Sequence, residues 1–377
     1  MILTRLRRVM SIAVVSLALT ITLATFATPV RAHVQYVTPG GDAVDAVGFL
    51  LATLADPLNA ALLGGGGAAG AVGLLAYLRV RPARHDVLRL RELLAGYRDL
   101  LPWLLRLSVG LPLVGAGFAG YLFTPLFTPS PATFVRLVGI TIGFLLLFGF
   151  GTRLVAASGL VVYGWALTQS PNLLLAFEYV PGFLAIALVG GGRPSADQVV
   201  ARMAADERTL YSRVDPFYRR VAVPFVERVD SFRQYVPLVL RAGMGVAFVY
   251  LGIVQKLANP GDSLAVVAKY DLTAVVPVSP ELWVFGAGLV EVAVGLAFLS
   301  GTFTRGAAAA GFLLLTTTLF GLPDDPVLAH VTLFGLSSAL MVTGSGRFSL
   351  DTAVVPTLRR RFDPGIDHEG EGRPAAD

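Results

Sequence analysis

Two short segments of this chain repeat each other. The segment from Gly344 to Asp351 reads GSGRFSLD, and the segment from Gly190 to Asp197, 154 residues earlier, reads GGGRPSAD. Other landmarks keep a similar spacing, namely Arg153 with Arg305 and Arg106 with Arg241. Because each interval contains apolar stretches long enough to cross a bilayer, this spacing predicts a tandem duplication of one four-helix membrane unit.

The composition places the chain in lipid. Hydrophobic residues make up 55% of it and charged residues only 15%, so a soluble form would expose too much apolar surface. The formal net charge is +5, but the basic residues stand between apolar runs, and acidic residues accompany them in the long linker. Membrane orientation explains this pattern better than nucleic-acid binding does, so no nucleic-acid partner is expected.

Several kinds of cofactor chemistry are excluded by residue counts. The chain has no cysteine, so it forms no disulfide, thiolate nucleophile or Cys-ligated iron–sulfur cluster. Of its four histidines, only His330 falls in a predicted span, so no intrachain pair of axial haem ligands exists there. We therefore expect no haem, no iron–sulfur cluster and no metal.

The N-terminus resembles a secretory signal. Three arginines precede an apolar run from Val9 to Phe26, and Val30 and Ala32 supply small residues before His33. This pattern predicts a signal peptide over 1–32, with an uncleaved anchor as the alternative.

The apolar runs predict an all-α integral membrane protein: two tandem four-helix bundles, preceded by the signal peptide and one extra transmembrane helix. The N-terminal segment 33–100 holds that extra helix, near 57–78, and a basic cytoplasmic loop. The first repeat, 101–197, has spans near 103–123, 134–150, 154–169 and 172–189. The second repeat, 237–351, has spans near 237–257, 282–300, 306–321 and 327–343. A cytoplasmic amphipathic linker occupies 198–236, and a disordered cytoplasmic tail occupies 352–377.

The arginines indicate the orientation. Alternating the nine predicted spans from a cytoplasmic Arg79 cluster places most of the arginines inside, including those of the linker. This predicts a multi-pass plasma-membrane protein with the mature N-terminus outside and the C-terminus in the cytoplasm. The linker is expected to form interfacial helices whose arginines face lipid headgroups, or a docking surface for a partner subunit.

Charges inside predicted spans are the best candidates for a site, because each costs about 2.5 to 3.5 kcal/mol at mid-bilayer on insertion scales. Glu291 is expected near the membrane centre, and Lys256 can reach toward it from the outer leaflet. His330 lies in the outer third of the last helix, with Ser337 two turns along the same face. Lys256, Glu291 and His330 are predicted to form one polar cluster that acts catalytically or, with Ser337, binds a cofactor. A buried structural pair is the alternative.

The first repeat lacks this set. Alignment of the repeats places Tyr121 against Lys256, Gly139 against Glu291, and Glu178 against His330. We therefore expect the site in the second repeat, with Glu178 as a weaker second candidate.

The repeated endings admit two interpretations. In the structural one, the glycines end a helix, the arginine anchors at the interface, and the serine and aspartate cap the next segment. In the other, Arg193, Arg347 and Arg305 contact an anion or a lipid headgroup.

The second half resembles the DoxX family of four-helix membrane proteins. The resemblance rests on GVAFVYLGIVQKL (Gly245 to Leu257), Glu291, GTFTRGAAA (Gly301 to Ala309) and the closing GSGRFSLD. It implies an up-and-down four-helix bundle per repeat, and the family includes the membrane subunit of a thiosulfate:quinone oxidoreductase. The leading hypothesis is therefore a quinone-interacting membrane subunit of a redox complex. A non-catalytic membrane scaffold and a small-solute carrier are the alternatives.

Overall fold

The computed structural model describes residues 34–38, 41–80, 82–214 and 218–353. The predicted signal peptide and all but the first two residues of the predicted tail lie outside these ranges. Within them the regular secondary structure is helical, and an isolated bridge joins Leu122 to Thr124. The prediction of an all-helical fold is confirmed.

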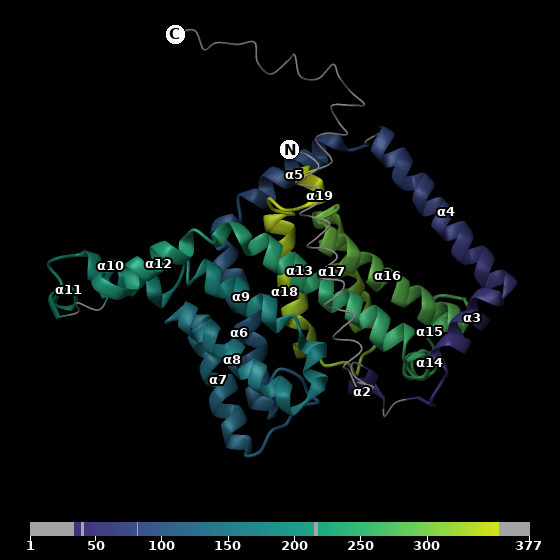
Figure 1. Ribbon diagram of the computed structural model, residues 1–377, viewed down its shortest axis with the longest axis horizontal. Helices are drawn as coiled ribbons and strands as arrows, with labels where there is room; N and C mark the ends of the chain where they lie inside the picture. The colour runs from purple at the N-terminus through teal and green to yellow at the C-terminus, as the bar shows by residue number, and fades with distance from the viewer. Residues whose placement is uncertain (1–33, 39–40, 81, 215–217, 354–377) are drawn as a thin grey trace, which may run out of the picture.

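The helices follow the predicted order (Figure 1). The N-terminal segment contains α2 (Val34–Val37), α3 (Ala46–Ala55), α4 (Pro57–Val80), α5 (Arg84–Ala95) and η1 (Arg98–Leu100). The first half contains α6 (Leu101–Ala119), α7 (Ala132–Phe148), α8 (Thr152–Gln169), η2 (Pro171–Ala176) and α9 (Tyr179–Val189). The linker contains α10 (Ala196–Ala205), α11 (Leu210–Val214), η3 (Tyr218–Ala222), α12 (Val223–Asp230) and η4 (Arg233–Tyr235). The second half contains α13 (Val236–Tyr250), η5 (Leu251–Leu257), α14 (Pro260–Lys269), α15 (Leu272–Val275), α16 (Pro280–Ser300), α17 (Thr304–Gly321), α18 (Val327–Thr343) and α19 (Leu350–Ala353).

Within the described ranges, four helical stretches are long and apolar enough to cross a membrane: Pro57–Tyr77, Arg98–Ala119, Arg233–Leu257 and Pro280–Ser300. The helices α7, α9 and α18 are apolar but shorter. The chain is thus a multi-helix membrane protein. The predicted total of nine spans stays a prediction.

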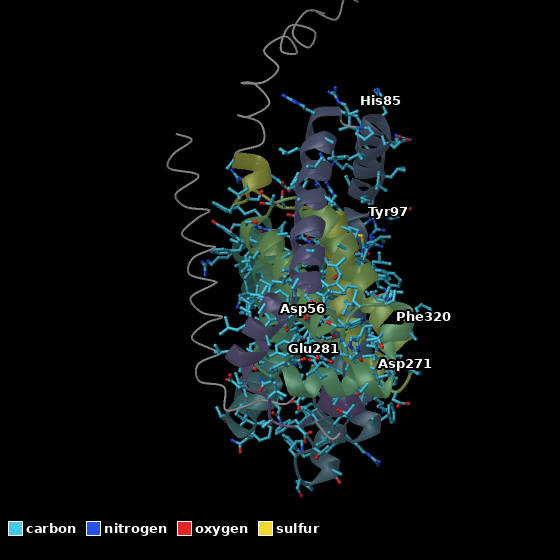
Figure 2. All side chains as sticks on the ribbon, turned by 90° about the vertical axis from the view of Figure 1, so that its right-hand side faces the viewer. Asp56, His85, Tyr97, Asp271, Glu281 and Phe320 are labelled. Carbon is cyan, nitrogen blue, oxygen red and sulfur yellow. The ribbon has the colours of Figure 1, made fainter. Side chains whose placement is uncertain are left out.

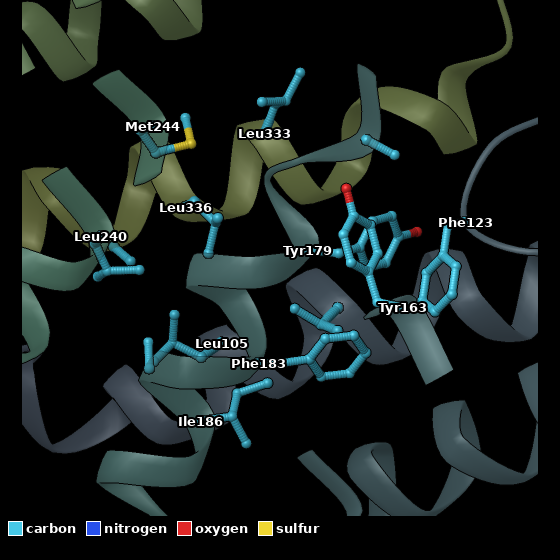
Figure 3. Close-up of a cluster of buried hydrophobic side chains, with 14 of the residues drawn as sticks. Leu105, Phe123, Tyr163, Tyr179, Phe183, Ile186, Leu240, Met244, Leu333 and Leu336 are labelled. Atoms are coloured by element: carbon cyan, nitrogen blue, oxygen red, sulfur yellow. The ribbon is translucent and has the colours of Figure 1, made fainter. Parts of the chain in front are cut away.

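The two halves share one hydrophobic core. Helix α6 packs against α18, and α13 packs against α9, so the first helix of each half meets the last helix of the other. Leu105 and Phe183 of the first half and Leu240 and Leu336 of the second lie in one buried cluster (Figure 3). Burial of these side chains against each other makes the halves one folding unit.

Within each half, the first two helices cross at paired glycines. A Cβ on Gly143 would lie 2.8 Å from the Gly110 carbonyl oxygen, and a Cβ on Gly295 would lie 2.9 Å from that of Gly245. Small residues are needed where helix backbones approach this closely in a membrane protein. The two crossings occupy corresponding places in the two halves.

A buried arginine closes the same end of each half. Arg106 Nη1 donates to the carbonyls of Leu146 and Leu147, both at 3.4 Å, and Nη2 donates to that of Pro194. Arg241 Nη1 donates to the carbonyls of Phe298 and Leu299, at 3.2 and 3.3 Å, and Nη2 donates to that of Phe348. Each guanidinium thus ties the first helix to the end of the second helix and to the segment after the fourth.

The structural interpretation expected the aspartates of the repeated endings to cap the next segment. Instead, each aspartate caps a different helix. Asp197 accepts from the backbone nitrogens of Gly151 and Thr152, at 2.6 and 2.9 Å, and so caps the start of α8 across the bundle. Asp351 makes the same kind of cap on α17. The expected local caps come from the serines: Ser195 Oγ accepts from Gln198 N at 3.1 Å at the start of α10, and Ser349 Oγ accepts from Thr352 N at 3.3 Å at α19.

Two parts stand away from the bundle. Helix α4 runs beside it, touching α3 and presenting apolar side chains such as Val72 and Leu75 outward (Figure 1). The helices α10, α11 and α12 form an arm that projects from the opposite side (Figure 1). Apolar surface of this kind is expected to face lipid or another protein.

Candidate functional site

Lys256 is carried by a π-helical turn. Helix α13 does not end as α6 does but continues into η5, which has the wider π-type turn. Such turns are rare and occur frequently at functional sites. Gly252 lets this segment lie against α16, because a Cβ there would be 2.7 Å from the Gly288 carbonyl oxygen. The close approach brings the Lys256 side chain to α16.

Glu291 lies in the middle of α16 and receives that side chain. Lys256 Nζ donates to Oε1 at 2.7 Å and to Oε2 at 2.8 Å. The side chain of Lys256 is 22% exposed and that of Glu291 is 13% exposed, so the pair is sheltered but still reachable from the lipid-facing surface. The two charges compensate each other, which is what a membrane interior requires of them.

The first half cannot hold an equivalent pair. A Cβ on Gly139, at the place corresponding to Glu291, would lie 3.2 Å from the Leu113 carbonyl oxygen and 3.3 Å from Gly117 Cα. At the place of Lys256 stands Tyr121, beyond the end of α6. The ion pair is therefore a property of the second half alone.

His330 occupies a different environment from the one predicted. Its Nε2 lies 3.4 Å from Asp325 Oδ2, and its Nδ1 lies 3.3 Å from the Pro326 carbonyl oxygen. Helix α18 packs mainly on α6, α17 and α13, whereas Glu291 faces η5. The predicted three-residue cluster is thus divided into a Lys256–Glu291 pair and an Asp325–His330 pair.

Ser337 lies deeper along α18. It is fully buried, and its Oγ has no hydrogen-bond partner within the described part of the chain. It does not share a contact with the Lys256–Glu291 pair in that part of the chain.

A second group of buried polar side chains surrounds the Asp325–His330 pair. Glu178, directly before α9, is 2% exposed, and its Oε2 has no partner within the described ranges. The Tyr36 hydroxyl of α2 hydrogen-bonds Thr124 Oγ1 and lies within electrostatic range of both Glu178 and Asp325. Burial raises the pKa of Tyr36 above its ordinary range.

Tyr36 and Asp325 were not predicted to belong to this group. Tyr36 belongs to the segment outside both repeats, and Asp325 precedes its helix in a polar loop. The one sequence signal for this group was the alignment of Glu178 in the first repeat with His330 in the second.

The arginines predicted to contact an anion have different surroundings. Arg305 donates from Nε to the Met341 carbonyl at 2.8 Å and from Nη2 to that of Val342 at 3.2 Å, so it closes the end of α18. Arg347 donates to Gln234 Oε1 at 2.6 Å, and Arg193 is exposed. Arg91 and Arg98 lie within electrostatic range of Arg305, so positive charge gathers at this end of the bundle.

The chemistry open to the Lys256–Glu291 pair is hydrogen bonding and proton exchange. An ammonium group has three donors, and Glu291 occupies two of those of Lys256. The neighbouring Gln255 is 4% exposed, and its Nε2 has no partner in the described chain. Among the residues that the structure describes, no three His, Asp or Glu side chains are grouped to hold a metal ion.

Comparison with known proteins gives one family. The DoxX family model matches residues 236–323, and it matches the first half nowhere. Neither the curated proteins nor the solved structures contain a match to this chain. The matched range contains η5, α16 and the ion pair between them. Residues 236–323 of this chain are therefore a DoxX family domain.

Proposed function

We propose that this protein is a quinone-interacting membrane subunit of a redox complex, with the quinone headgroup bound beside Lys256 and Glu291. The observation that carries the proposal is the ion pair between the Lys256 ammonium and the Glu291 carboxylate, which lies in the middle of α16. This pair is partly open toward lipid. A quinone dissolves in the lipid phase, and its carbonyl oxygens accept hydrogen bonds.

The residues present suit such a headgroup. Lys256 has one donor left beyond those directed at Glu291, and the preceding residue, Gln255, has an Nε2 with no partner in the described part of the chain. A bound quinone would accept two electrons together with two protons. Glu291 is placed to hold or give up a proton there. The electrons would come from a partner subunit's cofactor or from a small reductant such as a sulfur oxyanion, since the chain has no cysteine.

The test is quinone binding by purified protein in lipid nanodiscs. A short-chain ubiquinone analogue is titrated while tryptophan fluorescence is followed, because Trp283 lies in α16 two turns from Glu291, about 12 Å along the axis. The double change Lys256→Met with Glu291→Leu should abolish saturable quenching. The matched control, Arg89→Met with Glu92→Leu, removes an exposed ion pair of α5 and should leave quenching unchanged. Equal affinity in wild type and in a folded double variant would reject the proposal.

The two halves are best understood as copies of one DoxX-like unit, although the family model matches only the second. The support is geometric: the arginine bonds, the aspartate caps and the glycine crossings recur at corresponding residues. In this proposal the first copy keeps the packing function and has lost the ion pair.

The orientation proposed from the arginines places the C-terminus and the linker in the cytoplasm. Arg91 and Arg98 lie near Arg305, and His85 lies at one end of the molecule, away from Asp56 and Glu281 (Figure 2), which supports this orientation. The test introduces single cysteines at exposed Ala205 and Ala274 for labelling by an impermeant thiol reagent. Only position 274 should label in intact cells, and the reverse pattern would overturn the orientation. Ser263 is unsuitable, because it is buried and donates to the Gln255 carbonyl.

A second function, as a scaffold, is favoured by the arm of α10, α11 and α12. Leu210 is 78% exposed and Val214 is 77% exposed, and both stand on the projecting arm. Such surface suits a partner subunit or a lipid headgroup region contacted through 198–236. Leu210→Asp with Val214→Asp should release a copurifying partner while quinone quenching persists; unchanged copurification would remove the arm from the interface.

A further inference from the structure

The polar groups around the Asp325–His330 pair lie where the two halves and the N-terminal segment meet. Glu178 comes from the first half, Asp325 and His330 come from the second, and Tyr36 comes from α2. The Asp325–His330 pair is separate from the Lys256–Glu291 site, which lies between η5 and α16. A role for these groups is therefore separate from the quinone proposal.

The geometry of the Asp325–His330 pair suits one proton shared between the imidazole and the carboxylate. A carbonyl oxygen only accepts, so the contact from Nδ1 to Pro326 O requires a hydrogen on Nδ1. Nε2 then faces Asp325 Oδ2 at 3.4 Å, and the two atoms can hydrogen-bond by sharing one further proton, bound to either of them. The pair is neutral in both arrangements, and Asp325 Oδ1 remains buried without a partner in the described chain.

Glu178 is buried with no cation against it in the described ranges. Its Oε2 is shielded from solvent and unpartnered, and the side chain is 2% exposed. An ionised carboxylate in such a position is unfavourable, whereas a protonated carboxyl is tolerated. The groups in electrostatic range of Glu178, from each element around it, are mostly tyrosines: Tyr36 of α2, Tyr163 of α8 and Tyr179 of α9. Beyond them stand Tyr121, Tyr250, Asp325 and His330.

We infer that this interface cluster is a proton-binding site, in which Glu178 takes up and releases the proton and Tyr36 connects it to the Asp325–His330 pair. Tyr36 lies within electrostatic range of both acids, and its hydroxyl both donates and accepts. The ligand is a proton alone, so the step is protonation of the Glu178 carboxylate and its reverse.

The test is infrared spectroscopy of the full-length protein in liposomes as the pH is raised. A protonated carboxyl has its own carbonyl stretching band, which shifts in deuterium oxide. Wild type should show this band at neutral pH and lose it in one titration. Glu178→Gln should lack the component that this titration removes in wild type, whereas Glu281→Gln, at an exposed first-turn position of α16, should keep it.

Two further variants keep the result decisive. Tyr36→Phe should retain the band and move the pH of its loss, because it removes a polar hydroxyl within electrostatic range of Glu178. If Glu178→Gln does not fold, Glu178→Asp must move the titration, since its carboxyl is one carbon nearer the backbone. If Glu178→Gln loses the same band component with rising pH as wild type does, or if Glu178→Asp leaves the titration unmoved, the inference is overturned. Quinone quenching in these variants would separate it from the proposed function.

Discussion

Lys256 Nζ lies 2.7 Å from one carboxylate oxygen of Glu291 and 2.8 Å from the other, which joins η5 to the middle of α16. The contact uses both oxygens of the acceptor, so it fixes the lysine side chain more firmly than a single hydrogen bond would. It also explains why two charges are tolerated at this depth. Each charge supplies the other's polar partner where water is absent.

The first prediction concerns the stability of that pair. Lys256→Met or Glu291→Leu alone leaves an uncompensated charge, and each should lower the free energy of unfolding by about 3 to 5 kcal/mol. The double change removes both charges and should recover most of this loss. Thermal unfolding in mild detergent measures the cycle. Additive losses in the double variant would show that the two side chains do not interact.

A second prediction concerns the buried arginines. Arg106→Ala and Arg241→Ala each remove a donor from three carbonyls, of which one keeps a backbone donor (Gly149 N to Leu146 O, Gly301 N to Phe298 O). An unsatisfied buried group costs about 1 to 3 kcal/mol. The two variants should be destabilised to a similar degree, and lysine should not rescue either, because an ammonium cannot span three carbonyls as a planar guanidinium does. Unfolding midpoints would decide this, with Arg193→Ala, at an exposed position, as the control.

A third prediction concerns the helix crossing beside the site. Gly295→Ala would place a Cβ 2.6 Å from Val249 Cγ2 and 2.8 Å from Val249 N, so the helices must separate. We expect a loss of about 1 to 3 kcal/mol from overpacking. Gly64→Ala in α4 is the control, since a Cβ there meets nothing within 4 Å. Equal stability of the two variants would contradict the close crossing.

The fourth prediction is a pH dependence in the loop before α18. Burial raises the pKa of Asp325 above its ordinary value of 3.8, with the His330 charge opposing the rise. The folded state therefore binds this proton more tightly than the unfolded state does. The resulting contribution to stability is complete below pH 3.8 and is lost as the pH rises through the raised pKa of the folded state.

Asp325→Asn should remove that contribution and flatten the fall in unfolding midpoint with rising pH. The adjacent Asp324 is the control of opposite sign, because hydrogen bonds from Lys269 and Tyr270 lower its pKa. Its contribution is present above the ordinary value of 3.8 and is lost as the pH falls through the lowered pKa. It should be small, since this ion pair is solvent-exposed. A slope unaffected by Asp325→Asn would show that the carboxyl titrates normally.

The sequence alone determined the helical class, the positions of the main helices and the family of the second half. Helix positions follow from apolar runs, because a stretch that must lie in lipid has to satisfy its backbone internally. The family follows from residues within one stretch, Gly245 to Leu257 with Glu291 nearby. Both properties depend on local sequence, and so they could be predicted.

Only the tertiary structure decided which polar side chains meet. His330 was predicted beside Glu291 from its depth in the helix, but depth does not specify which neighbour a helix face meets. His330 instead meets Asp325, five residues earlier in the loop before α18, and α2 brings Tyr36 to the same interface. The Lys256–Glu291 contact joins residues 35 apart in the chain and depends on the π-helical turn of η5 and on the crossing of Gly252 with Gly288. Such contacts arise from long-range packing, which no local pattern of residues encodes.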